Sequence, residues 1–306
     1  MTSVLGAIRL GTRASRLARI QTDLVRKALA RLDPTVAFRS VEITTEGDRD
    51  LRTPLPEIGG KGVFTQELEQ ALKDGTIDLA VHSLKDVPVE PSPGLILAAV
   101  GMREDPREVW ISVKGWTLAT LPPGAKVGTC STRRAAQLLV HRPDLQLAPL
   151  RGNVDTRVAK AQAGEFDAIV IAAAGVHRLG LTSAITEYLP LEIMLPAPGQ
   201  GALAVQCRTD DAAMLELLRG LEERDVRAAT DAERGFLEGL GGGCAAPIAA
   251  FGRAEERRIH LEGLVLSLDG QRQIRLVWDG PAADGRRVGL RLAAEARSKG
   301  AEALLA

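Results

Sequence analysis

The sequence has few aromatic residues, few cysteines, few lysines and no long apolar run, and each shortage excludes a class of protein. Aromatic residues make up only 3% of the chain, too few for the mixed basic and aromatic surfaces that bind nucleic acid. No stretch approaches the roughly 18 apolar residues that span a bilayer. Basic and acidic residues balance at 39 each, which argues against a general nucleic-acid or membrane binder. We therefore expect neither nucleic acid nor a membrane as a partner.

The three cysteines, Cys130, Cys207 and Cys244, lie far apart in the sequence. Their spacing fits neither a disulfide framework nor a zinc site. Residues 1–11 lack the basic start and apolar run of a secretory signal. We therefore expect a cytoplasmic protein without a metal site, with Cys130 and Cys207 in structural roles.

Strand-like and helix-like patterns alternate along the first two thirds of the chain, which at 306 residues is too long for one ordinary core. The first series predicts strands at residues 7–10, 36–43, 77–81 and 95–100, and helices at 15–30 and 64–72. The second series predicts strands at 126–128, 145–147 and 168–172, and helices at 131–140 and from 154. Strands that alternate with helices indicate two α/β domains.

Breaks in these patterns near residues 101–106 and 195–201 suggest the domain boundaries. A strand at 202–207 follows the second break and could return to the first domain. We expect residues 1–101 plus 200–219 to form a discontinuous first α/β domain and residues 102–199 to form a second. Residues 220–306, with helices before and after three strands, predict a smaller α+β domain.

Polar residues follow several of the predicted strands, in the loops at residues 12–15, 82–86, 129–134, 151–153 and 173–175. In open α/β sheets, ligands bind beyond the carboxyl ends of the strands, where the first N–H groups of the helices are free. Four of these five loops carry a hydroxyl or a cation. Together they indicate a site for an anionic ligand.

Arginine supplies 31 of the 39 basic residues and lysine only 8. This excess fits codon bias, but it also fits carboxylate binding, because a guanidinium binds a carboxylate through two hydrogen bonds. Arg133 and Arg134 open a predicted helix, where the helix dipole disfavours cations. They are either solvated side chains or partners of a bound anion.

Asp86 and Cys244 are the residues best suited to chemistry. Asp86 follows a buried strand and is either a turn residue or a carboxylate that stabilises a developing cation and passes protons. Cys244 follows three glycines and is either a chance cysteine or an attachment site that a large ligand can approach. Lys61 lies in a glycine-rich and proline-rich stretch, residues 53–62, that is either a mobile flap or a plain surface loop.

Seven short motifs, in this order, resemble the porphobilinogen deaminase (hydroxymethylbilane synthase) family over nearly the whole chain. They are Gly11-Thr12-Arg13-Ala14-Ser15, Gly59-Gly60-Lys61-Gly62, Val81-His82-Ser83-Leu84-Lys85-Asp86-Val87-Pro88, Arg103-Glu104-Asp105-Pro106-Arg107, Leu150-Arg151-Gly152-Asn153, Pro198-Gly199-Gln200-Gly201 and Gly242-Gly243-Cys244. The sequence departs from the family pattern at Cys130, at residues 245–246 and at residues 249–251. These departures concern fine contacts and leave the charged set intact.

The resemblance implies two α/β domains like the lobes of type II periplasmic binding proteins, with the active-site cleft between them, plus the smaller α+β domain. It implies a dipyrromethane cofactor attached through a thioether to Cys244, and Asp86 as the catalytic residue. The residues implied to bind the carboxylates of cofactor and substrate are Arg13, Ser15, Lys61, Ser83, Lys85, Thr129, Ser131, Arg133, Arg134, Arg151, Arg157, Arg178 and Gln200.

The activity that the resemblance implies is the joining of four porphobilinogen molecules, head to tail, into hydroxymethylbilane with loss of ammonia. The reaction is a stepwise electrophilic substitution on the covalent primer, in tetrapyrrole biosynthesis. The resemblance also favours a monomer. One alternative is a non-catalytic binder of anionic metabolites, which would have no need for a cysteine in a glycine loop. A nucleotide-dependent enzyme is the other, but the sequence has neither a P-loop nor a dinucleotide-binding glycine motif.

Overall fold

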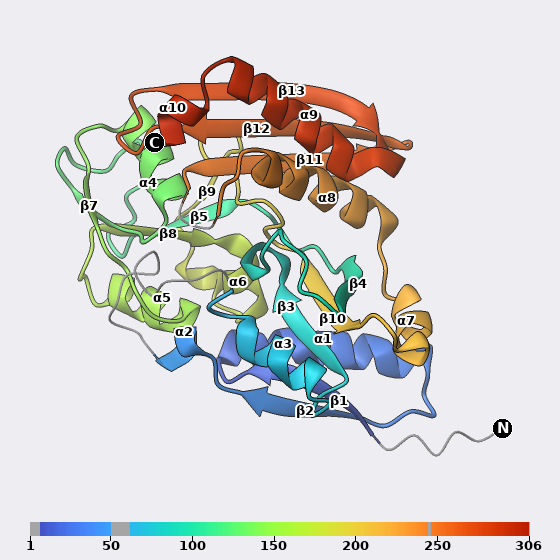
Figure 1. Cartoon of the computed structure of the whole chain (residues 1–306). Coiled ribbons are helices and arrows are strands. Elements are labelled where there is room, and N and C mark those ends of the chain that lie inside the picture. The colour runs from blue at the N-terminus through green and yellow to red at the C-terminus, as the bar shows by residue number, and fades with distance from the viewer. Residues whose placement is uncertain (1–6, 50–61, 244–245, 306) are drawn as a thin grey trace.

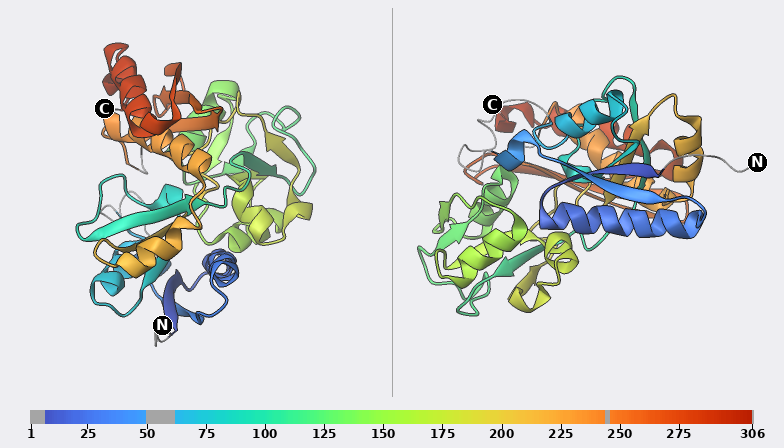
Figure 2. Two further views of the ribbon diagram at one scale, coloured as in Figure 1. Left: turned by 90° about the vertical axis from the view of Figure 1, so that its right-hand side faces the viewer. Right: turned by 90° about the horizontal axis from the view of Figure 1, so that it is seen from below.

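The computed structural model describes residues 7–49, 62–243 and 246–305, and in these residues the strands form three separate sheets. Figure 1 shows the sheet of N-terminal strands at the bottom of the view and the C-terminal sheet at the top. In Figure 2 (left) the sheets and their helices form three groups around a common centre. Residues from all three groups therefore approach one another near that centre.

The first sheet has the strand order β2-β1-β3-β10-β4. Its strands are β1 (Ile8–Arg13), β2 (Phe38–Ile43), β3 (Leu79–Ser83), β4 (Leu95–Gly101) and β10 (Leu203–Arg208). β1 runs parallel to β2 and β3, whereas β10 runs antiparallel to β3 and β4. The strand predicted at residues 202–207 therefore does return to the first sheet.

Helices pack against both faces of the first sheet. Successive residues of a strand point to opposite faces, so the apolar side chains on each face need helices to cover them. The helical segments are α1 (Arg16–Leu32), α2 (Glu46–Arg49), α3 (Gln66–Lys73), the 3₁₀ turn η1 (Leu84–Asp86) and α7 (Ala212–Arg219). Leu29 of α1 and Leu218 of α7 share a buried cluster with Leu79. Leu72 of α3 packs in another cluster with Ala80, the next residue along β3. Both faces of this sheet are thus closed.

The second sheet repeats this plan with the order β7-β6-β8-β5-β9. Its strands are β5 (Glu108–Ile111), β6 (Lys126–Gly128), β7 (Gln146–Ala148), β8 (Ala168–Ala172) and β9 (Glu187–Leu189). β6 is parallel to β7 and β8, whereas β5 is antiparallel to β8 and β9. Its helical segments are α4 (Thr132–His141), α5 (Val154–Gln162), α6 (Ala173–Arg178) and the 3₁₀ turn η2 (Thr182–Ala184).

The C-terminal part is an antiparallel sheet of three strands with helices packed on it. The strands are β11 (Ile248–Glu255), β12 (Arg258–Leu266) and β13 (Gln273–Pro281), and the helical segments are α8 (Arg224–Gly239), η3 (Ala282–Asp284), α9 (Gly285–Ser298) and α10 (Glu302–Leu305). Phe236 of α8 and Leu292 of α9 are fully buried in one core with Leu261 of β12. Gly263 lies under the Phe236 ring, where a Cβ atom would collide with it. A large residue on the helix and a glycine on the strand therefore let α8 approach the sheet closely.

Two chain segments cross between the first and second sheets, and they are bonded to each other. One follows β4 and the other precedes β10. Glu104 donates its backbone N–H to Gly201 O at 3.1 Å, and Arg103 Nε donates to Gln200 O at 3.2 Å. The paired crossings bring the carboxyl ends of the parallel strands of both sheets toward one region.

The predicted fold class, two α/β parts and a smaller α+β part, is confirmed. The sequence patterns did not reveal β5, β9 or α7. The domain boundaries stay a prediction. Within the described residues, no helix is both long and apolar enough to cross a membrane.

Candidate active site

Several of the candidate site residues stand where parallel strands of the first two sheets end and helices begin. Ser15 follows β1 and caps α1, where its side chain accepts the N–H of Ala18 at 3.2 Å. Ser131 follows β6 and caps α4 by accepting the N–H of Arg134 at 3.4 Å. Thr129 is buried beside it and accepts the N–H of Ser131 through Oγ1 at 3.2 Å. These hydroxyls hold the helix starts in place.

Asp86 ends η1, directly after β3, and its side chain is partly exposed. Its carboxylate has no hydrogen bond or ion pair with another described residue. Its negative charge nevertheless acts on Lys85, on Arg157 and on the buried His82. Among the candidates, Asp86 is therefore a carboxylate near cations whose oxygens no described residue binds.

The loop around Asp86 is held from the C-terminal part. Arg234 of α8 donates to Val87 O at 2.8 Å and to Pro88 O at 2.7 Å. On the other side, Ser83 accepts a hydrogen bond from Gln21 Nε2 of α1 at 2.9 Å. The backbone around Asp86 is thus held from two helices, and none of these contacts uses the Asp86 side chain.

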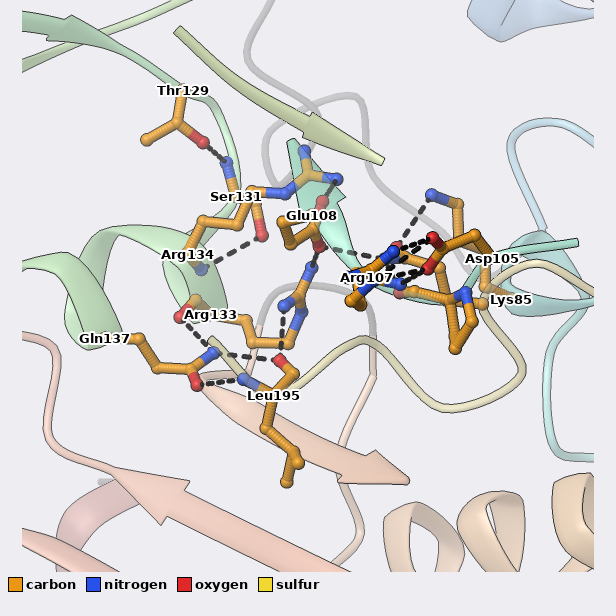
Figure 3. Close-up of polar contacts among 12 residues, drawn as sticks. Lys85, Asp105, Arg107, Glu108, Thr129, Ser131, Arg133, Arg134, Gln137 and Leu195 are labelled. Carbon is orange, nitrogen blue, oxygen red and sulfur yellow. Dashed lines mark hydrogen bonds and ion pairs between the residues drawn. The ribbon is translucent and has the colours of Figure 1, made fainter. Parts of the chain in front are cut away.

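Arg133 and Arg134 are both buried at the start of α4, and both pair with the carboxylate of Glu108 on β5. Arg133 Nη2 lies 2.5 Å from Glu108 Oε1, and Arg134 Nη2 lies 2.8 Å from Glu108 Oε2. Figure 3 shows the carboxylate between the two guanidinium groups. These cations and their hydrogen bonds hold the pKa of Glu108 well below its usual range, although burial opposes this. The anion expected near the helix start is thus, in part, a residue of the chain itself.

Gln200 joins this pair to Lys85. The buried amide donates from Nε2 to Glu108 Oε1 at 3.0 Å and to Pro106 O at 2.7 Å. Its Oε1 accepts a hydrogen bond from Lys85 Nζ at 3.2 Å. Desolvation first, and the charge of Arg134 next, lower the pKa of Lys85 to about 8. A residue of the second crossing thus connects both sheets at the site.

Arg151 and Arg157 lie around the start of α5. Arg157 Nε donates to Gly152 O at 2.7 Å. Desolvation, with the charge of Arg134 as the second cause, lowers the pKa of Arg157 to about 10. Arg151 is half-buried, and its charge acts on Arg157. These two cations extend the positive region that Arg134 begins.

The contacts of Arg13 and Arg178 lie outside the cluster of Lys85, Arg134 and Arg157. Arg13 stacks over the Phe64 ring, with its guanidinium carbon 4.1 Å from the ring centre. Arg178 Nη2 donates to Met102 O at 2.9 Å and to Gly201 O at 2.8 Å, and so ties the two crossings together. Lys61 and Cys244 lie outside the described residues.

A group that carries carboxylates fits this arrangement. Among the described residues whose charges act on Lys85 and Arg157, the cations are Arg133, Arg134 and Arg151, and the carboxylates are Asp86 and Glu108. Arg134 Nε is buried and has no hydrogen-bond partner among the described residues. A buried donor without a partner is costly. The cluster therefore has both the charge and a free donor for an anionic ligand.

Sequence reasoning missed Glu108, Glu233 and Arg234, and it named Arg103 only as part of a motif. Glu233 of α8 is fully buried and lies 2.8 Å from Arg103 Nη2. A cavity of about 370 Å³ opens beside this pair, between the first crossing, α8 and β11. A signal for Glu108 was present, since a single glutamate precedes the apolar run Val109-Trp110-Ile111. A carboxylate at such a position is buried and needs a cation.

Comparison with known proteins assigns most of the chain to one family. The family model described as porphobilinogen deaminase, dipyromethane cofactor binding domain, matches residues 8–216. The model of the porphobilinogen deaminase C-terminal domain matches residues 228–298. The chain is 47% identical to a porphobilinogen deaminase of Syntrophotalea carbinolica, over 98% of this chain and 95% of that protein. It is 49% identical to one of Desulforudis audaxviator, over 97% of this chain and 96% of that protein.

Among solved structures, the chain is similar to a substrate-binding domain of a putative molybdenum transporter from Clostridium difficile. The sequences are 12% identical, the match covers 72% of this chain and 93% of that one, and the TM-score is 0.45.

Proposed function

This chain belongs to the porphobilinogen deaminase family, and on that premise we propose how its residues join four porphobilinogen molecules into hydroxymethylbilane. The observation that carries the proposal is the state of Asp86. Its carboxylate lies among cations at the strand ends, and no described residue binds its oxygens. A carboxylate in such a place is suited to act on a ligand rather than to support the fold.

Asp86 is the catalytic residue in this proposal. As ammonia leaves the substrate, positive charge develops on the substrate ring and is shared with the pyrrole nitrogen. A fixed carboxylate within reach of that N–H stabilises the charge. The same group accepts the ring proton that is lost after the new carbon–carbon bond forms. The loop contacts from Arg234 and Gln21 keep the carboxylate in position without occupying it.

The cationic residues bind the acetate and propionate groups of the substrate and of the growing chain. Two carboxylates are added with each ring, and guanidinium groups bind them with defined geometry. The proposed set is Arg13, Lys61, Lys85, Arg133, Arg134, Arg151, Arg157 and Arg178, with Ser15, Ser83, Thr129, Ser131 and Gln200 as polar neighbours. Arg134 supports this role most directly, because its buried Nε has no partner among the described residues.

The family carries a dipyrromethane cofactor, and Cys244 is the proposed attachment site through a thioether. When bound, the cofactor supplies the first nucleophilic ring and keeps the chain anchored. This chain's own part is to neutralise the carboxylates with the Arg133, Arg134 and Arg157 side chains, and to hold them where little water competes. The excess of cations over carboxylates in the described cluster fits that task.

A mass measurement tests the attachment. We expect the denatured protein, after incubation with porphobilinogen, to be heavier by two pyrrole units, on the peptide that contains Cys244. Cys244→Ser should have no such excess, and Cys130→Ser, the matched thiol control, should keep it. If the wild type stayed unmodified and released no bilane, a non-catalytic binder of anionic metabolites would be the better explanation.

Asp86→Asn tests the catalytic assignment, because it keeps the shape of the side chain and removes its charge. We expect turnover to fall by about 100-fold or more, while the excess mass on the Cys244 peptide remains. Asp74→Asn, an exposed carboxylate bonded to Gln70 on α3, is the control and should turn over like the wild type. Turnover near the wild-type rate in Asp86→Asn would contradict the assignment.

We also propose that the protein acts as a monomer in the cytoplasm. Cys130 and Cys207 are free thiols, and a thioether at Cys244 needs a third, which suits a reducing compartment. Light scattering during gel filtration tests the oligomeric state, and a mass of twice that of one chain would contradict it.

A further inference from the structure

Glu108 is a fully buried carboxylate at the cation cluster, and it comes from a different sheet than the loop that carries Asp86. It opens β5, which runs antiparallel to both of its neighbours in the second sheet, β8 and β9. Glu108 lies between the side chains of Arg133 and Arg134 on α4. Each oxygen of the Glu108 carboxylate pairs with one of the two guanidinium groups (Figure 3). An ionised carboxylate is buried at this depth only when cations and hydrogen-bond donors replace water around it.

Arg133 and Arg134 differ in which of their guanidinium nitrogens have partners among the described residues. Arg133 donates from Nη1 to Leu195 O at 2.7 Å and from Nη2 to Glu108. Gln137, one turn further along α4, donates to the same carbonyl oxygen at 3.0 Å. Arg133 is therefore built into the framework. Arg134 pairs with Glu108 through Nη2, whereas its buried Nε has no partner among the described residues. The shared carboxylate thus anchors one end of Arg134 and leaves Nε for another acceptor.

The charge of Glu108 also acts on Lys85, which lies in η1, directly after β3 of the first sheet. Gln200 donates to Glu108 Oε1 and accepts from Lys85 Nζ. The charged groups that face Lys85 are Asp86 on its own loop, Arg133 and Arg134 of α4, and Glu108 of β5. The two carboxylates favour the charged lysine and the two guanidinium groups oppose it. Glu108 therefore offsets part of the repulsion that its own arginine partners exert on Lys85.

We propose, on the basis of the function proposed above, that Glu108 is a positioning residue for ligand carboxylates. It fixes the Arg133 and Arg134 guanidinium groups so that Arg134 presents Nε to the ligand, and through Gln200 it keeps Lys85 charged beside them. Glu108 itself touches no ligand. It acts through the three cations.

Two variants distinguish the effect of the Glu108 charge from the effect of the length of its side chain. Glu108→Gln keeps the size and removes the charge, and one end of the amide then presents a donor to a guanidinium. Glu108→Asp keeps the charge, but its shorter side chain cannot pair with both arginines. Glu233→Gln is the matched control, because Glu233 is also a fully buried carboxylate paired with an arginine, but its own contacts are with Arg103, Gly199 and Gly252 and not with the three cations.

The first readout is the reactivity of the Lys85 amine, which needs neither cofactor nor turnover. Reductive methylation over a pH series, mapped on the Lys85 peptide by mass spectrometry, gives the midpoint at which the amine loses its proton. We expect the midpoint in Glu108→Gln to lie about one pH unit below that of the wild type, because a stabilising charge is gone. Glu108→Asp and Glu233→Gln should keep the wild-type midpoint.

The second readout is the binding of carboxylates. In Glu108→Asp we expect KM for porphobilinogen to rise about tenfold while kcat stays within about twofold of the wild type, the pattern of lost binding. The fraction of protein carrying the excess mass at Cys244 should also fall. Glu233→Gln should lose stability without this change of KM.

Two results would overturn the inference. One is a wild-type Lys85 midpoint in Glu108→Gln together with wild-type KM and loading in Glu108→Asp. The other is an equal change in Glu233→Gln in every readout, because Glu108 would then support only the fold. If Glu108→Gln failed to fold, the KM and loading of Glu108→Asp would decide. A wild type that forms no bilane would contradict the proposed function instead, and the Lys85 midpoints would still test Glu108.

Discussion

Glu233 Oε2 accepts the backbone N–H of Gly199 at 2.6 Å, so a helix of the C-terminal part holds one of the two crossings between the α/β sheets. The same carboxylate pairs with Arg103 on the other crossing and accepts the N–H of Gly252 on β11 at 2.8 Å. One buried side chain therefore joins both crossings to α8 and β11. Burial raises the pKa of Glu233, although Arg103 and the two N–H groups oppose this.

We expect Glu233→Gln to lower the free energy of unfolding by about 3 kcal/mol, because it leaves Arg103 buried without its counter-ion. Urea unfolding at neutral pH measures this. The control is Glu238→Gln on the same helix, which breaks an ion pair with the exposed Arg286 and should cost less than about 1 kcal/mol. Equal losses in the two variants would show that the buried pair does not hold the crossings.

Gly201 stands where the crossings touch, and we expect Gly201→Ala to be strongly destabilising. Its φ is +89°, and a Cβ atom there would collide with the carbonyl oxygen of Glu104. Gly115→Ala is a matched control, because Gly115 has φ +71° with open space around the Cβ position. The left-handed conformation alone costs an alanine about 1 kcal/mol, so urea unfolding should show that loss for Gly115→Ala. Gly201→Ala should lose at least about 2 kcal/mol more.

Arg234→Met should reduce turnover without weakening substrate binding. The arginine holds the carbonyl groups of Val87 and Pro88 and so fixes the loop that carries Asp86. Methionine keeps much of the packing and removes the donors. We expect kcat to fall about tenfold and KM to stay within about threefold. Arg286→Met, an exposed arginine against the same helix, should leave both unchanged. A rise in KM with an unchanged kcat would contradict this role for Arg234.

The sequence predicted the elements whose signals are local. The alternation of strands and helices located β1, α1, β3, α4 and β8, because an apolar run and a capping serine lie within a few residues of each other. The same reasoning placed Asp86 directly after a buried strand. It did not find β5, because its pairing with β8 is antiparallel and joins residues about sixty positions apart. The apolar run after Glu108 is visible in the sequence, but nothing near it identifies β8 as the strand with which it pairs.

The candidate site shows the same limit at Arg133 and Arg134. The sequence left open whether these two cations are solvated or bind an anion. It could not identify the anion, because Glu108 precedes Arg133 by 25 residues and reaches both arginines only after β5 has joined the sheet. Glu233 was missed for a similar reason, since its partners Arg103 and Gly199 lie on two separate segments. The assignments of Lys61 and Cys244 stay predictions.

Lys85 should make substrate binding depend on pH in the alkaline range. Desolvation and the charge of Arg134 lower its pKa to about 8, so the amine is charged below that pH and becomes neutral as pH rises through it. Most arginine side chains keep their charge over this range, and Arg157, whose pKa desolvation lowers to about 10, titrates alike in the wild type and in the control. We therefore expect KM for porphobilinogen to rise as pH increases through about 8, as Lys85 ceases to attract carboxylates.

Lys85→Arg is the control, because it keeps a charge at every pH tested, whereas the titration of the substrate's own amine remains in both proteins. Steady-state kinetics between pH 6.5 and 9.5 on the two proteins, over about three units around this pKa, should show a steeper rise of KM in the wild type. Identical profiles would mean that the charge of Lys85 does not contribute to substrate binding.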